Sequence, residues 1–195
     1  SDVYKRQIQI SRLFYERFIS GDDISLFSPH DVPNLYDLFG TEEFDGLYRT
    51  YEEDDRIPKK RIPAQELFGQ LIKERAETGR IYIMNIDHCN SHSSFLDKVE
   101  MSNLCQEITL PTKPLQHIDD PNGEIALCIL SAINVGKVRS DNELEELCDL
   151  TVRALDELID YQKYPVIAAE QGTKNRRSLG AVSYTHLTLP TSKIV

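Results

Sequence analysis

The sequence predicts an α/β protein, and three stretches carry this prediction. Residues 63–78 place their apolar side chains along one helical stripe, with Gly79 directly after it as a helix terminator. An apolar run at residues 80–86 follows at once and is typical of a buried strand. Residues 141–162 form a long amphipathic helical pattern. A helix, a glycine and an apolar strand in succession are typical of α/β domains.

Three more helices are expected before these elements. Ile8–Ile19 shows the apolar spacing of one helical face, and Gly21 ends it. Asp31 is expected to cap a short helix, and Thr41 to cap a third one. The acidic tail of that third helix, residues 52–55, is expected to be a solvated face.

A second strand-like stretch lies further along the chain. Residues 123–135 are largely apolar and contain Cys128. The region before it, from Asn85 to Gly123, is rich in prolines and polar residues and is expected to be mostly loop.

Composition narrows the function classes. The 195 residues carry 22 Lys+Arg against 32 Asp+Glu, a net charge of −10, which disfavours a nucleic-acid partner. No apolar run is long enough to span a membrane, and no signal segment opens the chain, so a cytoplasmic protein is expected. Four cysteines in such a chain point to metal, redox or buried thiols rather than structural disulfides.

Both ends of the chain are predicted to be foreign to the protein. Residues 1–7, SDVYKRQ, translate the transposase-adapter DNA TCAGATGTGTATAAGAGACAG, and its reverse complement encodes residues 182–187, VSYTHL. One sequencing adapter in two orientations thus explains both ends. Residues 1–7 and 181–195 are therefore excluded from fold reasoning. The natural stretch is expected to be residues 8–180, cut from a longer protein at arbitrary points.

A group of potential metal ligands follows the first predicted strand. Asp87-His88-Cys89 and His92 are ligand types, but Asn90-Ser91 between them suggest a turn, and no second ligand pair follows. We therefore expect polar groups that satisfy the backbone at a strand end, and no metal site.

Residues 103–107 place three chemically active side chains in alternation. In an extended segment, Asn103, Cys105 and Glu107 project to one face, which then carries a carboxamide, a thiol and a carboxylate. That set suits redox or radical chemistry assisted by a base, although the same pattern also occurs in purely structural segments.

The other three cysteines show no chemical pattern of their own. Cys128 lies in an apolar strand-like run, where a cysteine is usually an inert small hydrophobe. Cys148 lies on the apolar stripe of the long helix and is expected in the core, and Cys89 is expected to be structural.

Several ordered segments resemble one known family. They are residues 81–90 (IYIMNIDHCN), 102–108 (SNLCQEI), 110–114 (LPTKP) and 122–128 (NGEIALC), with further similarity at 26–37 and 161–165. In this order and spacing they closely resemble the large (α) subunits of class I ribonucleotide reductases. The resemblance covers residues 8–180.

The resemblance implies a fold. The family has a ten-stranded α/β barrel with a finger loop threaded through its centre. Residues 8–180 are then a partial barrel: a helical part at 8–79, barrel strands and the finger loop at 80–136, and a helix at 141–163. An open partial barrel exposes apolar surface, so the isolated chain is expected to be inactive and prone to aggregation.

The resemblance also implies roles for four residues. Cys105 matches the finger-loop cysteine that becomes a thiyl radical and abstracts the 3′ hydrogen of the substrate. Glu107 matches the general base on the 3′ hydroxyl, and Asn103 the amide that hydrogen-bonds the substrate. Cys128 matches one of two cysteines that reduce the 2′ position and end as a disulfide. The partner cysteine is not in this chain, and Cys89 and Cys148 do not match it.

The implied activity is the reduction of ribonucleoside diphosphates to deoxyribonucleotides. The family pairs with a small (β) subunit that holds a metal–tyrosyl radical. It also forms a homodimer, responds to ATP and deoxynucleotide effectors, and is reduced by thioredoxin or glutaredoxin. No cofactor, metal, nucleic acid or membrane is expected to bind residues 8–180. Two alternatives are a segment of an adenosylcobalamin-dependent reductase and a non-catalytic helical interaction module.

Overall fold

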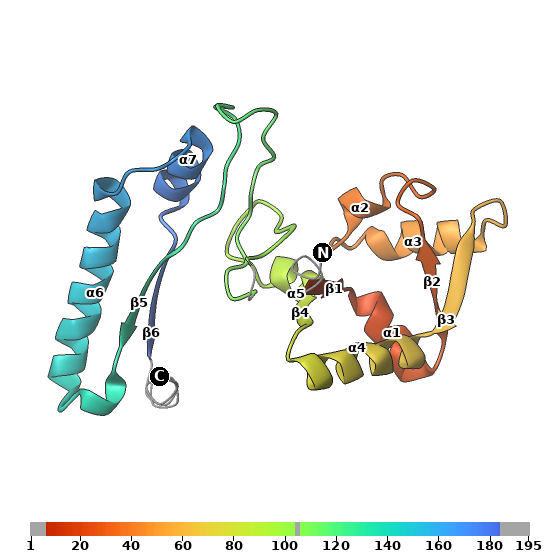
Figure 1. Ribbon diagram of the computed structural model, residues 1–195, viewed down its shortest axis with the longest axis horizontal. Helices are drawn as coiled ribbons and strands as arrows, with labels where there is room; N and C mark the ends of the chain where they lie inside the picture. Colours follow the sequence, from red (N-terminus) through yellow and green to blue (C-terminus); the bar gives the residue numbers. More distant parts are fainter. Residues whose placement is uncertain (1–6, 104–105, 184–195) are drawn as a thin grey trace. The chain divides into compact units, whose positions relative to one another are not determined.

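A computed structural model describes residues 7–103 and 106–183 of the chain. The chain divides into two compact units, 1–111 and 112–195. Helices alternate with strands in both units, and the strands form three two-stranded sheets (Figure 1). The α/β class is confirmed, whereas the described residues form no closed barrel.

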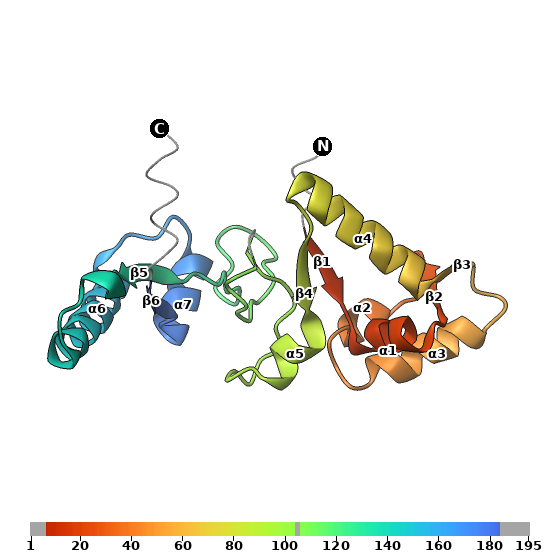
Figure 2. The same cartoon turned by 90° about the horizontal axis from the view of Figure 1, so that it is seen from below.

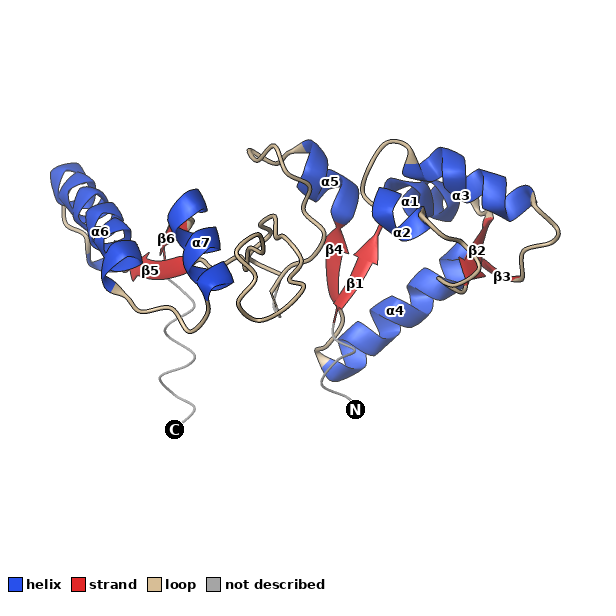
Figure 3. Cartoon of the chain, turned by 90° about the horizontal axis from the view of Figure 1, so that it is seen from above, coloured by secondary structure: helices blue, strands red, loops and turns tan. Residues whose placement is uncertain are grey.

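The first unit contains a parallel strand pair. β1 (Gln7–Ile10) pairs with β4 (Tyr82–Asn85), and Ile8 lies opposite Ile83 (Figure 3). Parallel neighbours need a long crossover, which is supplied here by the helices between them. The predicted strand at 80–86 is confirmed with narrower bounds, because Ile86 already begins the next helix.

The first helix begins later than the sequence predicted. α1 runs from Arg12 to Ser20 and ends at Gly21, which takes a φ of 79°. The hydroxyl of Ser11 accepts a hydrogen bond from the Phe14 amide at 3.4 Å and caps this helix. A helix from Ile8 is therefore wrong: residues 7–10 read Gln-Ile-Gln-Ile, a period of two that suits a strand.

An antiparallel strand pair was not predicted from the sequence. β2 (Asp23–Phe27) pairs with β3 (Lys59–Pro63), so that Ile24 lies opposite Ile62. The sequence does not predict β3, because the strand contains the basic run Lys59-Lys60-Arg61 and is apolar on one face only.

The next two helices begin later in the chain than the sequence predicted. α2 (Leu35–Leu38) begins after Asn34, and α3 (Phe44–Glu53) begins after Glu43. Neither Asp31 nor Thr41 is a helix cap, so both predicted caps are wrong. The Thr41 hydroxyl instead donates to the carbonyl of Leu38 at 2.8 Å, which closes the turn between the two helices.

α4 and α1 enclose the main core of this unit. α4 (Ala64–Thr78) follows Pro63 and ends at Gly79, as predicted, and it packs against α1 (Figure 2). Phe14 and Phe18 of α1 meet the Phe68 ring at centroid distances of 6.1 and 5.0 Å. The buried core residues are Ile10, Leu13, Phe14, Ile24, Val32, Leu35, Phe44, Tyr48 and Ala64.

A buried polar network links α1, β2 and α3. Arg17 forms an ion pair with Glu52, and the two side chains are 14% and 11% exposed. The Ser25 hydroxyl donates to Glu52 at 2.7 Å, and the Tyr48 hydroxyl bonds both backbone groups of Ser25 at 2.7 Å. The expectation that residues 52–55 form a solvated face is therefore wrong for Glu52, which faces inward from α3.

The second unit is built on another parallel strand pair. β5 (Ile129–Ile133) pairs with β6 (Leu179–Ser183). The crossover contains a short 3₁₀ turn at Val135–Lys137, α6 (Asp141–Tyr161) and α7 (Ile167–Arg176). α6 packs on both strands (Figure 1). The long helix is confirmed, and the strand predicted at 123–135 is confirmed only in its C-terminal half, at residues 129–133.

The apolar stripe of α6 is only partly covered. Leu155 and Ile159 are buried, whereas Leu150, Val152 and Leu158 are between 44% and 64% exposed. Cys148 is exposed, so its predicted core position is wrong within this unit. The buried side chains of α6 lie in its C-terminal half. The apolar stripe therefore extends beyond the surface that the other described residues cover.

No helix among residues 7–103 and 106–183 is long and apolar enough to cross a membrane.

The adapter origin of residues 1–7 and 181–195 stays a prediction. Gln7 and Ala181–Ser183 lie in β1 and β6, where backbone pairing accepts almost any side chain. In an unbroken genomic contig, the reading frame is expected to continue past Gly180 without the 182–195 peptide. Sequencing that contig checks the prediction, and the same peptide encoded there by the genome would contradict it.

Candidate active site

A turn-type hydrogen bond joins Asn103 and Gln106. The Gln106 amide donates to the Asn103 carbonyl at 3.1 Å, and Gln106 takes a φ of 64°. The backbone is therefore not extended at these two residues, and the shared face of residues 103, 105 and 107 stays a prediction. Glu107 is exposed just after the turn, and Cys105 lies outside the described residues.

The side chain of Asn103 closes this turn. Its Oδ1 accepts a hydrogen bond from the Ile108 amide at 2.9 Å, and the Ser102 hydroxyl lies 2.7 Å from the Ile108 carbonyl oxygen. These bonds join the segment that ends at Asn103 to Ile108. Within the part of the chain that the structure describes, the Nδ2 of Asn103 has no acceptor, so it remains able to donate.

Gln9 of β1 anchors the segment that enters the turn. Its Nε2 donates to the Glu100 carbonyl at 2.8 Å. The Lys98 ammonium donates to the Asp37 carbonyl at 2.7 Å.

Asn90 is the main anchor, and the sequence reasoning missed it. Its Oδ1 accepts from the Val99 amide at 2.7 Å, and its Nδ2 lies 3.1 Å from the Val99 carbonyl and 3.2 Å from the Gly40 carbonyl. Val99 is fully buried. A side chain that satisfies both backbone groups of one distant residue leaves no local sequence signal.

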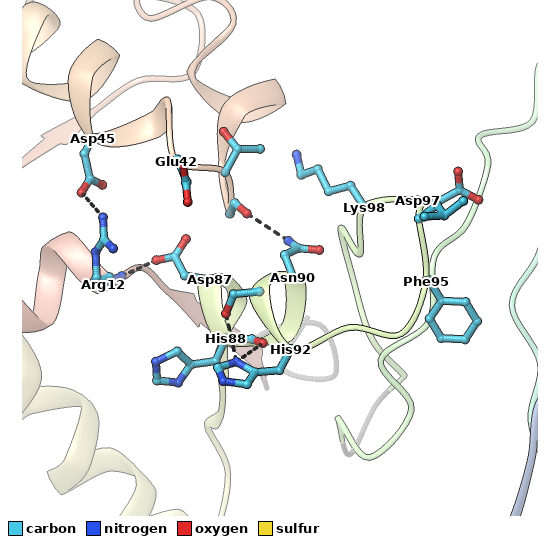
Figure 4. A pocket seen from close by; sticks show the side chains of 14 residues that line it. Arg12, Glu42, Asp45, Asp87, His88, Asn90, His92, Phe95, Asp97 and Lys98 are labelled. Carbon is cyan, nitrogen blue, oxygen red and sulfur yellow. Dashed lines mark hydrogen bonds and ion pairs between the residues drawn. The ribbon is translucent and has the colours of Figure 1, made fainter.

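Residues 86–91 form a helix, not the expected turn. α5 (Ile86–Ser91) follows β4 directly, and its start is held by Asp87, which accepts from the backbone amide of Arg12. Arg12 lies between Asp87 and Asp45 in a cavity of about 550 Å³ (Figure 4). The rings of His88 and His92 are 5.7 Å apart and nearly perpendicular.

This helix shows no metal-binding arrangement. Among residues 7–103 and 106–183, no three His, Cys, Asp or Glu side chains gather in a way that could hold a metal ion. Cys89 packs against a small cluster that includes Met84 and Ile86, and its burial raises the pKa of the thiol. An uncharged, half-buried thiol on an apolar cluster has a packing role.

Cys128 lies in the second unit, directly before β5 rather than within it. It is half-buried, and the Ile129 amide next to it donates to the Ser178 carbonyl at 3.2 Å. A Cβ added at Gly180 would lie 3.9 Å from the Cys128 sulfur. Cys128 therefore stands where the loop joins the sheet.

A buried carboxylate lies four residues before Cys128. Glu124 Oε1 accepts from the Lys113 ammonium at 2.8 Å, and its Oε2 accepts from Arg176 Nη2 at 2.6 Å. The hydrogen bond from Lys113 lowers the pKa of Glu124, burial opposes this, and the hydrogen bond from Arg176 adds to the lowering. Glu124 is thus held as an anion between two cations.

Comparison with known proteins identifies the family. Residues 5–183 match the family model described as the barrel domain of ribonucleotide reductase. The chain is 57% identical over 178 residues to ribonucleoside-diphosphate reductase subunit alpha of Haemophilus influenzae and to ribonucleoside-diphosphate reductase 1 subunit alpha of Escherichia coli. Each alignment covers 89% of this chain, and 24% and 23% of the respective relative.

More distant relatives give the same result. The alpha subunit of Enterobacteria phage T4 is 42% identical over 181 residues, and the large subunit of Danio rerio is 35% identical over 179 residues. These alignments cover 89% and 88% of this chain, and 24% and 21% of the relatives. The chain thus spans about a quarter of the length of the curated relatives it matches. It belongs to the barrel-domain family of ribonucleotide reductases.

Proposed function

We propose that this chain supplies the finger-loop part of the catalytic barrel of a ribonucleoside-diphosphate reductase α subunit. The observation that carries the proposal is the family match across residues 5–183, because it includes the segments around Cys105 and Cys128. The reaction is the radical-based reduction of ribonucleoside diphosphates to deoxyribonucleotides.

Each proposed residue performs one step. The thiyl radical of Cys105 takes the 3′ hydrogen atom of the substrate, which becomes the hydrogen of a restored S–H bond and leaves the radical on C3′. Glu107 accepts the proton of the 3′ hydroxyl. Cys128 and a partner thiol outside this chain supply two electrons and two protons for the 2′ reduction: the 2′ hydroxyl leaves as water, and the two sulfurs form a disulfide. Cys105 then returns the hydrogen atom to C3′.

The geometry of the turn supports these roles. The Oδ1 of Asn103 is occupied by the Ile108 amide, so its Nδ2 is the group that donates to substrate. Glu107 is exposed directly after the turn, where its carboxylate is accessible to a hydroxyl. Gln106, directly before Glu107, takes a positive φ of 64°, so the backbone leading into Glu107 is not that of a regular strand.

The two parallel strand pairs support the proposed barrel. β1 pairs with β4, and β5 pairs with residues 179–180, the part of β6 inside the predicted natural stretch. Each pair is joined through a helical crossover, which is the repeating unit of a parallel α/β barrel. Each pair leaves open edges that further strands of a ten-stranded barrel would cover.

The remaining partners follow from the family. The small subunit supplies the metal–tyrosyl radical, and ATP or deoxynucleotides act as effectors of the whole enzyme. Thioredoxin or glutaredoxin restores the active-site thiols. The intact large subunit is proposed to be a homodimer in the cytoplasm.

A chimeric enzyme tests the proposed function. Residues 8–180 replace the matching segment of the Escherichia coli α subunit, and the chimera is assayed for deoxycytidine diphosphate with the small subunit and thioredoxin. We expect turnover from the chimera and none from the isolated chain. A folded chimera that binds the small subunit and forms no product, or an isolated chain that forms product, would contradict the proposal.

A further inference from the structure

We propose that Glu124 is a positioning residue for the Cys128 thiol, acting through the ion triad that it forms with Lys113 and Arg176. The inference rests on the redox role proposed for Cys128 and adds the ion pairs that hold this thiol in place. It is argued from contacts within the second unit alone.

The triad joins two segments that are far apart in the sequence. Arg176, at the end of α7, donates to Glu124 through Nε at 2.9 Å and through Nη2 at 2.6 Å. Lys113 exchanges both backbone hydrogen bonds with Glu124, each at 3.0 Å, in addition to the ion pair. The relative exposures of the Glu124 and Arg176 side chains are 9% and 11%, so this contact is shielded from water and is charge-assisted.

The chain from Glu124 to Cys128 is then fixed at both sides. After Glu124, the Ile125 amide donates to the Ala168 carbonyl of α7 at 3.0 Å. After Cys128, the Ile129 amide donates to the Ser178 carbonyl, and β5 pairs with β6. Only three residues separate Glu124 from Cys128. Loss of the triad therefore removes a contact that fixes the chain just before the Cys128 thiol.

Among the described residues, the triad is a charged connection between this path and α7. Gly172 allows α7 to approach the Ile125 backbone closely, but that contact is steric and carries no charge. Lys113 and Arg176 are the cations that face Glu124, and Asp120 in the preceding turn is occupied by the amides of Gln116 and Asn122 at 2.9 Å. Neutralising Glu124 therefore removes the anion that Lys113 and Arg176 share.

The test measures how fast Cys128 reacts in the full 195-residue chain. Cys89, Cys105 and Cys148 are replaced by serine, so that Cys128 is the only thiol, and 4,4′-dithiodipyridine is the probe because it reacts in acid as well as at neutral pH. Glu124→Gln keeps the shape of the side chain and removes its charge. We expect the rate of Cys128 modification to rise about tenfold, because opening of the anchored segment becomes more frequent.

A matched variant separates positioning from general loosening of α7. Glu170→Gln removes an exposed ion pair with Lys174 (2.7 Å) on the same helix, and its rate is expected to stay within about twofold of the parent. The pH profile gives a second readout. In the parent and in Glu170→Gln, the rate of Cys128 modification should rise as pH falls through the pKa of Glu124. In Glu124→Gln, this pH-dependent rise should be absent.

Three outcomes would overturn the inference. They are an unchanged rate in Glu124→Gln, an equal rise in both variants, and an acid step that persists without Glu124. If circular dichroism shows that Glu124→Gln unfolds, Lys113→Met removes only the half-exposed cation. It should give a smaller rise, and an unchanged rate there also overturns the inference. None of these readouts needs substrate or turnover, so an inactive chimera would refute the proposed function and leave this result standing.

Discussion

Replacing Glu52 by alanine is expected to lower the free energy of unfolding of the first unit by about 3 kcal/mol. The substitution removes one partner of a buried ion pair. The Arg17 side chain, which is 14% exposed, then loses the carboxylate that accepts its ion-pair hydrogen bonds. It also takes the acceptor of the Ser25 hydroxyl, which is bonded to Glu52 at 2.7 Å. Urea unfolding of the full chain at low protein concentration, followed by circular dichroism, measures the change.

A second ion pair of α1 provides the control. Glu16→Ala removes the contact between Glu16 and Arg12 at 3.4 Å, where the side chains are 52% and 62% exposed. An exposed pair contributes little, so the expected loss is below about 0.5 kcal/mol. Equal losses from Glu52→Ala and Glu16→Ala would contradict the claim that the buried network holds α1, β2 and α3 together.

The same network gives a pH dependence. Burial alone would raise the pKa of Glu52, but the hydrogen bonds from Arg17 and Ser25 outweigh it and hold the pKa below its ordinary value. The native state therefore binds this proton less tightly than the unfolded chain does. The stabilisation is present above the unfolded pKa, about 4.3, and is lost as pH falls through the folded value. The Glu52→Ala chain should lack this acid-dependent part.

Replacing Gly172 by alanine is expected to destabilise the second unit by about 1–3 kcal/mol. A Cβ at this position would overlap the carbonyl oxygen of Ile125 and lie 3.1 Å from its carbonyl carbon. These are backbone atoms, so a side-chain rotation cannot relieve the overlap. α7 must move away from the segment that leads to Cys128.

A second helical glycine gives the opposite expectation. Gly69 lies inside α4, and a Cβ there meets nothing within 4 Å. Gly69→Ala should therefore stabilise the first unit by up to about 1 kcal/mol through helix propensity. Denaturant unfolding of both variants compares the signs. A gain in stability for Gly172→Ala would show that α7 does not press on Ile125.

The sequence predicts those elements whose signals are local. α4 and α6 carry their apolar stripe, their stop signal and, for α6, the capping Ser140 within the element itself. The pair of β2 and β3 was not predicted because the two strands are far apart in the chain and β3 begins with the basic run Lys59-Lys60-Arg61.

The site shows the same division between local and distant information. The resemblance selects Asn103, Cys105, Glu107 and Cys128 from their motifs. Alternation alone assumes an extended segment, which the hydrogen bond between the Gln106 amide and the Asn103 carbonyl does not fit. The groups that hold the site were not predictable. Asn90 binds the backbone of Val99, and Glu124 binds Arg176 at the end of α7, and neither pairing leaves a trace in the nearby sequence.

The central claim is that Cys105 carries the radical chemistry of this chain. Its most direct test is the amount of deoxycytidine diphosphate formed by the chimera that carries Cys105→Ser, compared with the chimera that carries Cys148→Ser on the exposed face of α6. We predict complete loss of product for Cys105→Ser and unchanged product for Cys148→Ser. Product formation by the Cys105→Ser chimera at the parent rate would contradict the account.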